Sequence, residues 1–471
     1  MSAVVRRDRH VIGYASGNFG KAIMLGSVDV ALLYLLTDII GIAPGRVSLL
    51  MMIVVAGDLV FDLLAGFFAA RAERHGIGYP RLIALCAVPC GLAFCAIFSL
   101  PLLQASGLAI IATLILFLRC AFAIIDVPHN SLLARVTSDS RTRGRASGYR
   151  TIFSSAAAVC VACVVAPLMR SATGEVATVR LAWLGAAGGA LFTGALLLAA
   201  WSSRSAQGAA PLSARRPHAR RWTPVALCPA PDGLFAAMAA LALVTGFATP
   251  MFTKTFLYLC TYVLKSPAFA GQVLLVLALS QMLGAAFWIT LVPRWDKTTL
   301  LSMSHGVAAA GIMLFAAAGE NQAALLAWSV LIGIGFAGVF MLPWGILADI
   351  IDFCEFRHRD RRETAWFSTI LVLLKCGGAA ALATIGWVLG LLGYAPGAAQ
   401  TEPVTLGMKA LAFGVPVAGS FAAILVLRRV RIGHALHARV RKVNQRRRER
   451  SSLPAHHGQG TEGVPQRAAA A

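Results

Sequence analysis

Two aspartates interrupt an otherwise uncharged apolar run of the sequence. Asp58 and Asp62 lie four residues apart in the stretch GDLVFDLLAG, so a helix places both carboxylates on one face. Two carboxylates this close repel each other, and either a bound cation or a proton held by one of them relieves the repulsion. The spacing therefore predicts a site that takes up and releases a small cation. The alternative interpretation is a pair neutralised permanently by a basic side chain: Lys21, Arg119 or Lys375.

Six further charged residues lie within apolar segments. They are Lys21, Asp29, Arg119, Asp126, Lys254 and Lys375. Together with Asp58 and Asp62 they make four acidic and four basic residues in these segments. A charge at the centre of a membrane helix costs roughly 3 kcal/mol, so these side chains should face one another or a water-filled cavity. Arg119 lies two turns before Asp126 on a similar helix face, which predicts an interaction between them. Lys21 and Asp29 are close enough in angle to line one cavity.

Helices must position these residues, because the composition is that of an integral membrane protein, 58% hydrophobic and only 13% charged. Twelve apolar stretches are long enough to cross about 30 Å of hydrocarbon, where lipid offers backbone groups no partner outside a helix. We therefore predict an all-α membrane protein. The predicted spans are residues 11–38, 47–70, 82–103, 107–132, 151–169, 181–202, 233–264, 268–292, 299–318, 323–347, 364–393 and 405–427.

The net charge of +22 comes from basic residues that fall mostly between alternate spans. This distribution does not indicate a nucleic-acid partner. Most of the 42 Lys and Arg lie on the side of the N-terminus, and basic loops are retained in the cytoplasm. The asymmetry predicts a multi-pass protein of the cell inner (plasma) membrane with both termini cytoplasmic. The first span lacks a small-residue cleavage site, so we interpret it as a retained helix.

A long segment rich in Pro, Ser, Ala and Arg separates the sixth and seventh spans. It divides the chain into an N-terminal six-helix bundle (1–202), a cytoplasmic linker (203–232), a C-terminal six-helix bundle (233–427) and a basic, partly disordered cytoplasmic tail (428–471). Two such halves are typical of the major facilitator architecture, in which a site near the membrane midplane opens to each side in turn. The tail either lies along anionic lipid headgroups or is solvated. We interpret three histidines as packing and tail residues: His305, His434 and His437.

Several short motifs follow one another in an order typical of a transporter family. They are FGKA, TDIIG, DLVFD, DVP, GYR, ADIIDFCEF and LLKCGGAAA, spread from Gly13 to about Arg431. With these motifs the chain resembles the glycoside-pentoside-hexuronide:cation symporters of the major facilitator superfamily. The resemblance implies the two-bundle fold and cation-coupled transport of a solute.

The resemblance also implies roles for individual residues. The cation-binding residues that it indicates are Asp58, Asp62 and Asp126. The substrate-binding residues that we expect are Lys21, Asp29, Arg119, Asp126, Asn130, Arg150 and Lys375. The residues that we expect to gate the cytoplasmic side are Asp349, Asp352, Glu355 and Arg150. Lys375 matches the family's eleventh-helix lysine, which contacts the acidic cluster.

The chain departs from the family pattern mainly at the positions that bind sugar in that family. Ala22 stands where the pattern has an acidic residue, and Asn130 stands where it has a tryptophan. Val55 replaces an arginine and Leu63 replaces a proline. Asp29 lies two turns beyond Ala22, so an acidic group has moved along the same face. We therefore expect the cation chemistry to be kept and the solute to be held differently.

The function that these residues favour is secondary active transport, in which binding of Na⁺ or H⁺ favours uptake of a sugar, a glycoside or another polar organic solute. The alternatives within transport are a lysolipid or amphipathic-solute symporter and a proton-driven exporter. A membrane enzyme is disfavoured because we find no nucleophile beside a base, no HExxH motif and no phosphate-binding glycine loop. A sensor or scaffold would tolerate loss of the ion site. We expect a monomer surrounded by membrane lipid, with no cofactor apart from the coupling ion.

Overall fold

The computed structural model describes residues 8–103, 107–165, 175–204, 233–359, 361–430 and 432–452. Most of the predicted linker (205–232) and the end of the predicted tail (453–471) lie outside the described residues. The first α-helices are α2 (Arg9–Ala15), α3 (Gly17–Tyr34), α4 (Pro44–Arg74), α5 (Tyr79–Ser99), α6 (Leu108–Ser131), α7 (Leu133–Val136), α8 (Ser140–Cys160) and α10 (Glu175–Ser202). They are followed by α11 (Gly233–Tyr258), α12 (Pro267–Leu291), α13 (Lys297–Ala317), α14 (Gln322–His358), α15 (Glu363–Leu391), α16 (Glu402–Lys409), α17 (Val415–Leu427) and α18 (His434–Ser452). Four π-helical turns extend these helices: η1 (Leu35–Ile39), η2 (Val161–Val165), η6 (Leu259–Val263) and η7 (Ala410–Gly414).

Twelve helical segments in the described residues are long and apolar enough to cross a membrane, which confirms the predicted all-α membrane fold. Two of them extend well past the predicted boundaries. The fifth begins at Ser140, since the polar stretch SRTRGRASGYR is helical too. The tenth continues to His358 through three acidic residues that the apolar pattern had excluded.

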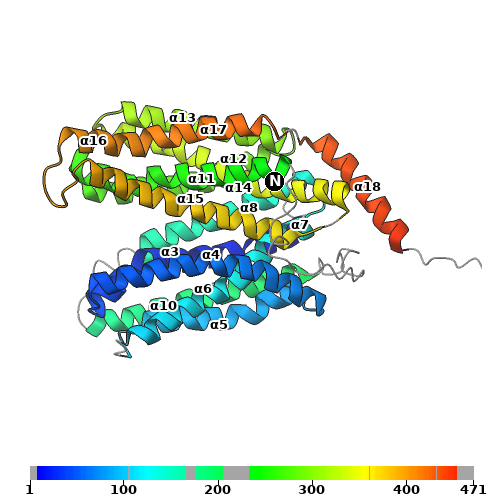
Figure 1. Cartoon of the computed structure of the whole chain (residues 1–471), viewed down its shortest axis with the longest axis horizontal. Coiled ribbons are helices and arrows are strands. Elements are labelled where there is room, and N and C mark those ends of the chain that lie inside the picture. The colour runs from blue at the N-terminus through cyan, green and yellow to red at the C-terminus, as the bar shows by residue number, and fades with distance from the viewer. Residues whose placement is uncertain are drawn as a thin grey trace, which may run out of the picture.

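The long helices run side by side in two groups (Figure 1). Helices α3 to α6 and α10 lie on one side, and α11 to α17 lie on the other. Helix α8 packs against α3 of the first group and against α12 and α14 of the second, and α4 packs against α15. The two groups meet at these contacts. Residues on α4, α8, α14 and α15 can therefore form a site between the two groups.

One end of the molecule carries α7, the beginning of α8, the end of α14 and helix α18 (Figure 1). We call it the tail end. Asp139 begins α8 there, because its Oδ1 accepts hydrogen bonds from the backbone N–H groups of Arg141 (3.0 Å) and Thr142 (2.9 Å). Helix α18 was not predicted, since its sequence is strongly basic and has few apolar residues.

Small residues allow neighbouring helices to approach closely. A Cβ atom at Gly189 of α10 would lie 2.7 Å from the backbone oxygen of Gly91 on α5. A Cβ atom at Gly335 of α14 would lie 2.5 Å from the backbone nitrogen of Ala308 on α13. Any larger residue at these two positions would push the helices apart.

Candidate functional site

The two aspartates of α4 face one lysine on α15. Lys375 Nζ lies 2.7 Å from Asp62 Oδ2 and 3.8 Å from Asp58 Oδ2. Asp62 is 0% exposed, and neither of its carboxylate oxygens has a hydrogen-bond partner. Asp58 is half-buried and has a second basic neighbour, Arg119 Nη1 of α6, at 3.2 Å. The expected pairing with Lys375 therefore has a geometric basis, and it joins the two halves of the chain.

The fourth-helix acid has its own basic partner from another helix. Lys21 Nζ of α3 donates a hydrogen bond of 2.7 Å to Asp126 Oδ1 of α6, and both residues are buried. The predicted interaction of Arg119 with Asp126 was wrong. Two helical turns separate these residues by about 10 Å along the axis, so Arg119 contacts Asp58 on neighbouring α4 instead.

The predicted substrate-binding residues Asn130 and Arg150 are bonded to each other. Arg150 Nη2 donates to Asn130 Oδ1, and Arg150 Nε donates to Asn18 Oδ1 at 3.1 Å. Asn130 Nδ2 donates to the backbone oxygen of Asp126 at 2.8 Å, which ties this group to the Lys21 pair. Arg150 Nη1 is buried without a hydrogen-bond partner. A polar centre with one unused guanidinium donor thus lies between α3, α6 and α8.

An aromatic ring from the other half covers this polar centre. The Arg150 guanidinium lies 5.3 Å from the ring centroid of Trp344 on α14, close enough for a cation–π contact. Trp344 and Asn18 were missed by the sequence analysis. Asn18 precedes Lys21 by three residues, so helical spacing could have placed it on the same face.

The three acids of α14 that we expect to gate the cytoplasmic side lie at the tail end within a dense set of ion pairs. Asp349 contacts Arg143 (3.1 Å) and Lys297 (2.6 Å), and Asp352 contacts Arg143 (2.7 Å). Arg361 binds Asp352 and Glu355, each at 2.7 Å. We call this set the tail-end network: Arg143, Lys297, Asp349, Asp352, Glu355, Arg361 and Glu363. It connects α8 of the first half with α13, α14 and α15 of the second.

The basic members of the tail-end network were not predicted. Arg150 was expected to gate as well, but Arg143, two turns earlier on α8, contacts the acids. Arg361 Nε also donates to Glu363 Oε1 at 2.5 Å. Burial alone would lower the pKa of Arg361, yet the charges of Glu363, Asp352 and Glu355 raise that pKa well above its ordinary value. Arg361 therefore stays charged and binds three acids at once.

Helix α18 is bonded to the same network. His437 Nε2 lies 2.9 Å from Asp352 Oδ2, and Asn444 Nδ2 donates to the backbone oxygen of Asp352 at 2.9 Å. Arg448 Nε donates to Glu355 Oε1 at 2.8 Å. His437, which we interpret from the sequence as a packing or tail residue, is buried against two acids of α14, and the sequence did not indicate this contact.

Two of the charged residues within spans are exposed. Asp29 lies on the surface of α3, away from the buried Lys21 with which it was expected to line a cavity. Lys254 is exposed on α11. Over the part of the chain that the structure describes, no three His, Cys, Asp or Glu side chains lie close enough to hold one metal ion. In this conformation Asp58, Asp62 and Asp126 each face a basic side chain instead.

Comparisons with known proteins agree with this architecture. The family described as "MFS/sugar transport protein" matches residues 13–434. YagG of Escherichia coli (strain K12), named as a candidate glycoside/cation symporter, is 26% identical over 432 residues, which cover 88% of this chain and 90% of that protein. The sphingosine-1-phosphate transporter MFSD2B of Mus musculus is 25% identical over 405 residues, covering 81% of this chain and 80% of that protein.

A solved structure shares the same fold. The MFS proton:xylose symporter XylE, bound to 6-bromo-6-deoxy-D-glucose, superposes with a TM-score of 0.62 at 11% identity. The match covers 88% of this chain and 93% of that chain.

Proposed function

The chain belongs to the MFS/sugar transport protein family, and from that premise we propose that it carries a polar organic solute across a membrane together with a small cation. Members of this family are transporters, so the protein is a membrane transporter and not an enzyme. A sequence relative is named as a candidate glycoside/cation symporter, and the structural neighbour XylE, which shows the shared fold, is named as a proton:xylose symporter. Sugars, glycosides and related polar solutes are therefore the substrates that we propose.

The observation that carries the proposal is the buried Asp62 facing Lys375. A carboxylate shielded from water needs a positive charge beside it, and Lys375 supplies one at 2.7 Å. Because the role of Lys375 is to supply this positive charge, a proton or Na⁺ bound to Asp62 can take the place of the lysine. Lys375 can leave, since its side chain is 33% exposed while Asp62 is fully buried.

This exchange would couple the cation to the solute. Before the cation binds, the acids Asp58, Asp62 and Asp126 are balanced by three basic side chains, Arg119, Lys375 and Lys21. A cation bound at Asp62 makes one positive charge surplus and frees the Lys375 ammonium. The freed ammonium can then donate hydrogen bonds to the solute, so the cation and the solute each favour binding of the other.

The solute would lie at the polar centre beside Trp344. Arg150 offers an unused guanidinium N–H there, and Lys21, Asn130 and Asn18 lie around it. Such a combination of an aromatic face with a few fixed polar groups suits a small ring that carries hydroxyl or carboxylate groups. We propose Arg150 and Lys21 as substrate-binding residues on this basis.

We propose that the tail-end network is the cytoplasmic gate. With both termini in the cytoplasm, the ion pairs between α8 and α14 close the cytoplasmic side in this conformation. Opening inward would require Asp349 and Asp352 to separate from Arg143. The predicted two bundles (1–202 and 233–427), joined by the cytoplasmic linker (203–232), would rock about the central site. We further propose a monomer in the cell inner membrane, without a cofactor.

One observation favours a second solute class. The mouse sphingosine-1-phosphate transporter matches this chain over most of its length at an identity close to that of YagG. A lysolipid-like solute with an anionic headgroup would place that headgroup against Arg150 and Lys21. The test must therefore include amphipathic solutes.

Uptake into proteoliposomes tests the proposal. Ligands are first found by thermal shift of the purified protein against sugars, uronates, nucleosides and lysolipids, with and without Na⁺, since a true ligand stabilises the folded state. Each ligand is then offered to proteoliposomes under an inward Na⁺ gradient, an inward H⁺ gradient or no gradient. We expect accumulation above the external concentration only with one of the gradients. Equal uptake under all three conditions would refute coupling. In a fourth condition with an outward H⁺ gradient, accumulation in that condition alone would identify a proton-driven exporter.

A further inference from the structure

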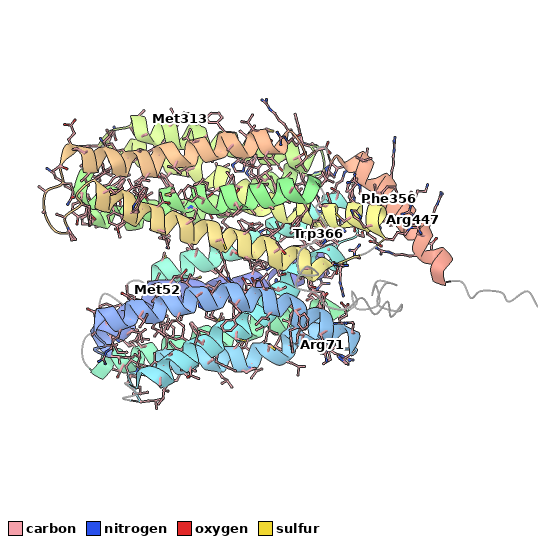
Figure 2. All side chains as sticks on the ribbon, viewed as in Figure 1. Met52, Arg71, Met313, Phe356, Trp366 and Arg447 are labelled. Atoms are coloured by element: carbon pink, nitrogen blue, oxygen red, sulfur yellow. The ribbon has the colours of Figure 1, made fainter. Side chains whose placement is uncertain are left out.

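A groove at the tail end remains outside the transport site. It lies between the beginning of α11, the end of α14 and helix α18, and has a volume of about 340 Å³. Its lining is Leu234, Phe353, Phe356, Arg357, Leu436, Arg439, Val440 and Val443. Figure 2 shows Phe356 and Arg447 together where α14 meets α18.

The walls of the groove have two kinds of chemistry. Most of the lining is apolar, and the side chains of Phe356, Leu436 and Val443 are exposed. Arg357 and Arg439 are the charged residues of the lining, one on α14 and one on α18. An apolar wall beside two guanidinium groups fits a molecule that has a hydrocarbon chain and an anionic head.

The position of the groove indicates which molecule this is. Helices α11 and α14 both belong to membrane spans, and α11 begins at Gly233, next to the groove residue Leu234. The groove therefore lies where the span of α11 begins and the span of α14 ends, and lipid headgroups surround the ends of membrane spans. Helix α18 carries seven Lys or Arg residues and one Glu over His434–Ser452, so this surface attracts anionic lipids.

We propose that the groove binds an anionic phospholipid, with an acyl chain against Phe353, Phe356 and Val440 and the phosphate between Arg357 and Arg439. Guanidinium groups suit phosphate because they donate two parallel hydrogen bonds. Arg447 acts differently, since its guanidinium lies 4.8 Å from the Phe356 ring centroid and its Nη1 donates to the Phe356 backbone oxygen at 2.8 Å. Arg447 thus fixes the ring that forms the edge of the groove.

A bound lipid would also hold α18 against α14. The same helix that forms one wall bonds Asp352 through His437 and Asn444, and Glu355 through Arg448. A lipid bridging Arg439 to Arg357 therefore stabilises these contacts with the tail-end network. This consequence for gating rests on the proposed function, whereas the binding of lipid does not.

Thermal unfolding of the purified full chain in detergent tests the binding. The probes are phosphatidylglycerol, phosphatidylcholine with the same acyl chains, and inorganic phosphate. Arg439→Glu removes one side of the phosphate site, and Leu436→Trp fills the groove. The matched control is Lys442→Glu, which makes the same charge change on the same helix but lines a different hollow, beside Asp139 and Asp296. A photoreactive phosphatidylglycerol with mapped labelling sites locates the lipid.

The proposal expects the wild type and Lys442→Glu to unfold at higher temperature with phosphatidylglycerol, and Arg439→Glu and Leu436→Trp to lose at least about half of that shift. Labelling should fall on residues 353–357 and 436–443. Equal shifts with phosphatidylcholine, a shift with inorganic phosphate alone, or equal losses in Arg439→Glu and Lys442→Glu would overturn it. Labelling confined to residues outside the groove would overturn it as well. Failure of solute transport would leave these outcomes unchanged.

Discussion

Lys375 Nζ lies 2.7 Å from Asp62 Oδ2, and this ion pair links the first half of the chain to the second. Asp62 is fully buried and accepts no hydrogen bond, whereas Lys375 is one-third exposed. A buried carboxylate cannot remain charged alone at low cost. It must keep Lys375 or take another cation, and we propose that this choice couples ion binding to movement of the two halves.

Replacing Asp62 by asparagine should abolish cation-driven accumulation. The amide has nearly the same shape but carries no negative charge, so neither Na⁺ nor H⁺ is attracted. For a typical coupling free energy, the cation raises the affinity for the solute about 5- to 150-fold. In Asp62→Asn the ratio of the affinities with and without the cation should fall to nearly one. Solute binding with and without the cation measures it, and the control is Asp29→Asn on the exposed face of α3. An unchanged cation dependence in Asp62→Asn would defeat the assignment.

Replacing Lys375 by valine should shift the pH dependence of transport. The two α4 carboxylates lose their shared positive neighbour, so the negative charge between the two halves is no longer compensated and the demand for a coupling cation should increase. A tenfold change in cation affinity corresponds to roughly 1.4 kcal/mol. The pH profile of solute uptake measures it, and Lys254→Val, another lysine of a span but exposed, is the matched control. An identical profile in both variants would contradict the pairing.

Much of the fold could be predicted from the sequence, because a membrane span is a local property. Length and hydropathy were enough to place twelve spans near their final positions. The two corrected boundaries, at Ser140 and His358, lie where the helices continue with charged residues. Those charges are tolerated because residues from other helices neutralise them, as Arg143 does for Asp349.

The partners of the charged residues could not be predicted in the same way. The balance of acidic and basic residues indicated that pairs would form, but the partners depend on which helices are neighbours. Arg119 therefore contacts Asp58 across two helices rather than Asp126 on its own helix. His437 was missed because the strongly basic α18 has no apolar pattern that indicates burial.

Breaking the pair of Lys21 and Asp126 should destabilise the protein, and removing both charges should restore part of the loss. Lys21→Met leaves a buried carboxylate without its partner, for which we expect a cost of about 3–5 kcal/mol. Lys21→Met combined with Asp126→Leu leaves no buried charge, so it should unfold at higher temperature than either single variant. Thermal unfolding in detergent measures all three. Additive losses would show that the two residues do not act as a pair.

The cap of α8 should contribute stability that depends on pH. Burial opposes ionisation of Asp139, but hydrogen bonds from Thr142 and Arg141 outweigh it and hold its pKa below the ordinary value. A lowered folded-state pKa gives stability that is present above pH about 4, the unfolded value, and lost as the pH falls through the folded-state value. Asp139→Ala should therefore cost about 1 kcal/mol at neutral pH and less in acid, whereas Asp139→Asn, which still caps, should cost little. A cost for Asp139→Ala that is the same at pH 7 and pH 3 would contradict the ionic contribution.

Removing Arg143 should open the tail end. This guanidinium binds Asp349 at 3.1 Å and Asp352 at 2.7 Å across the two halves, so its loss favours the conformation in which α8 and α14 separate. Cys354 is 3% exposed in this structure and lies on α14 between Asp352 and Glu355, so its alkylation rate reports the opening. A shift of roughly 1.4 kcal/mol would raise that rate about tenfold. Asp352→Asn, which keeps the side-chain shape, should act in the same direction, while Arg446→Ala on the exposed face of α18 should not. Thermal unfolding excludes a general loss of structure, and a Cys354 alkylation rate equal in all variants would mean that these ion pairs do not hold the gate closed.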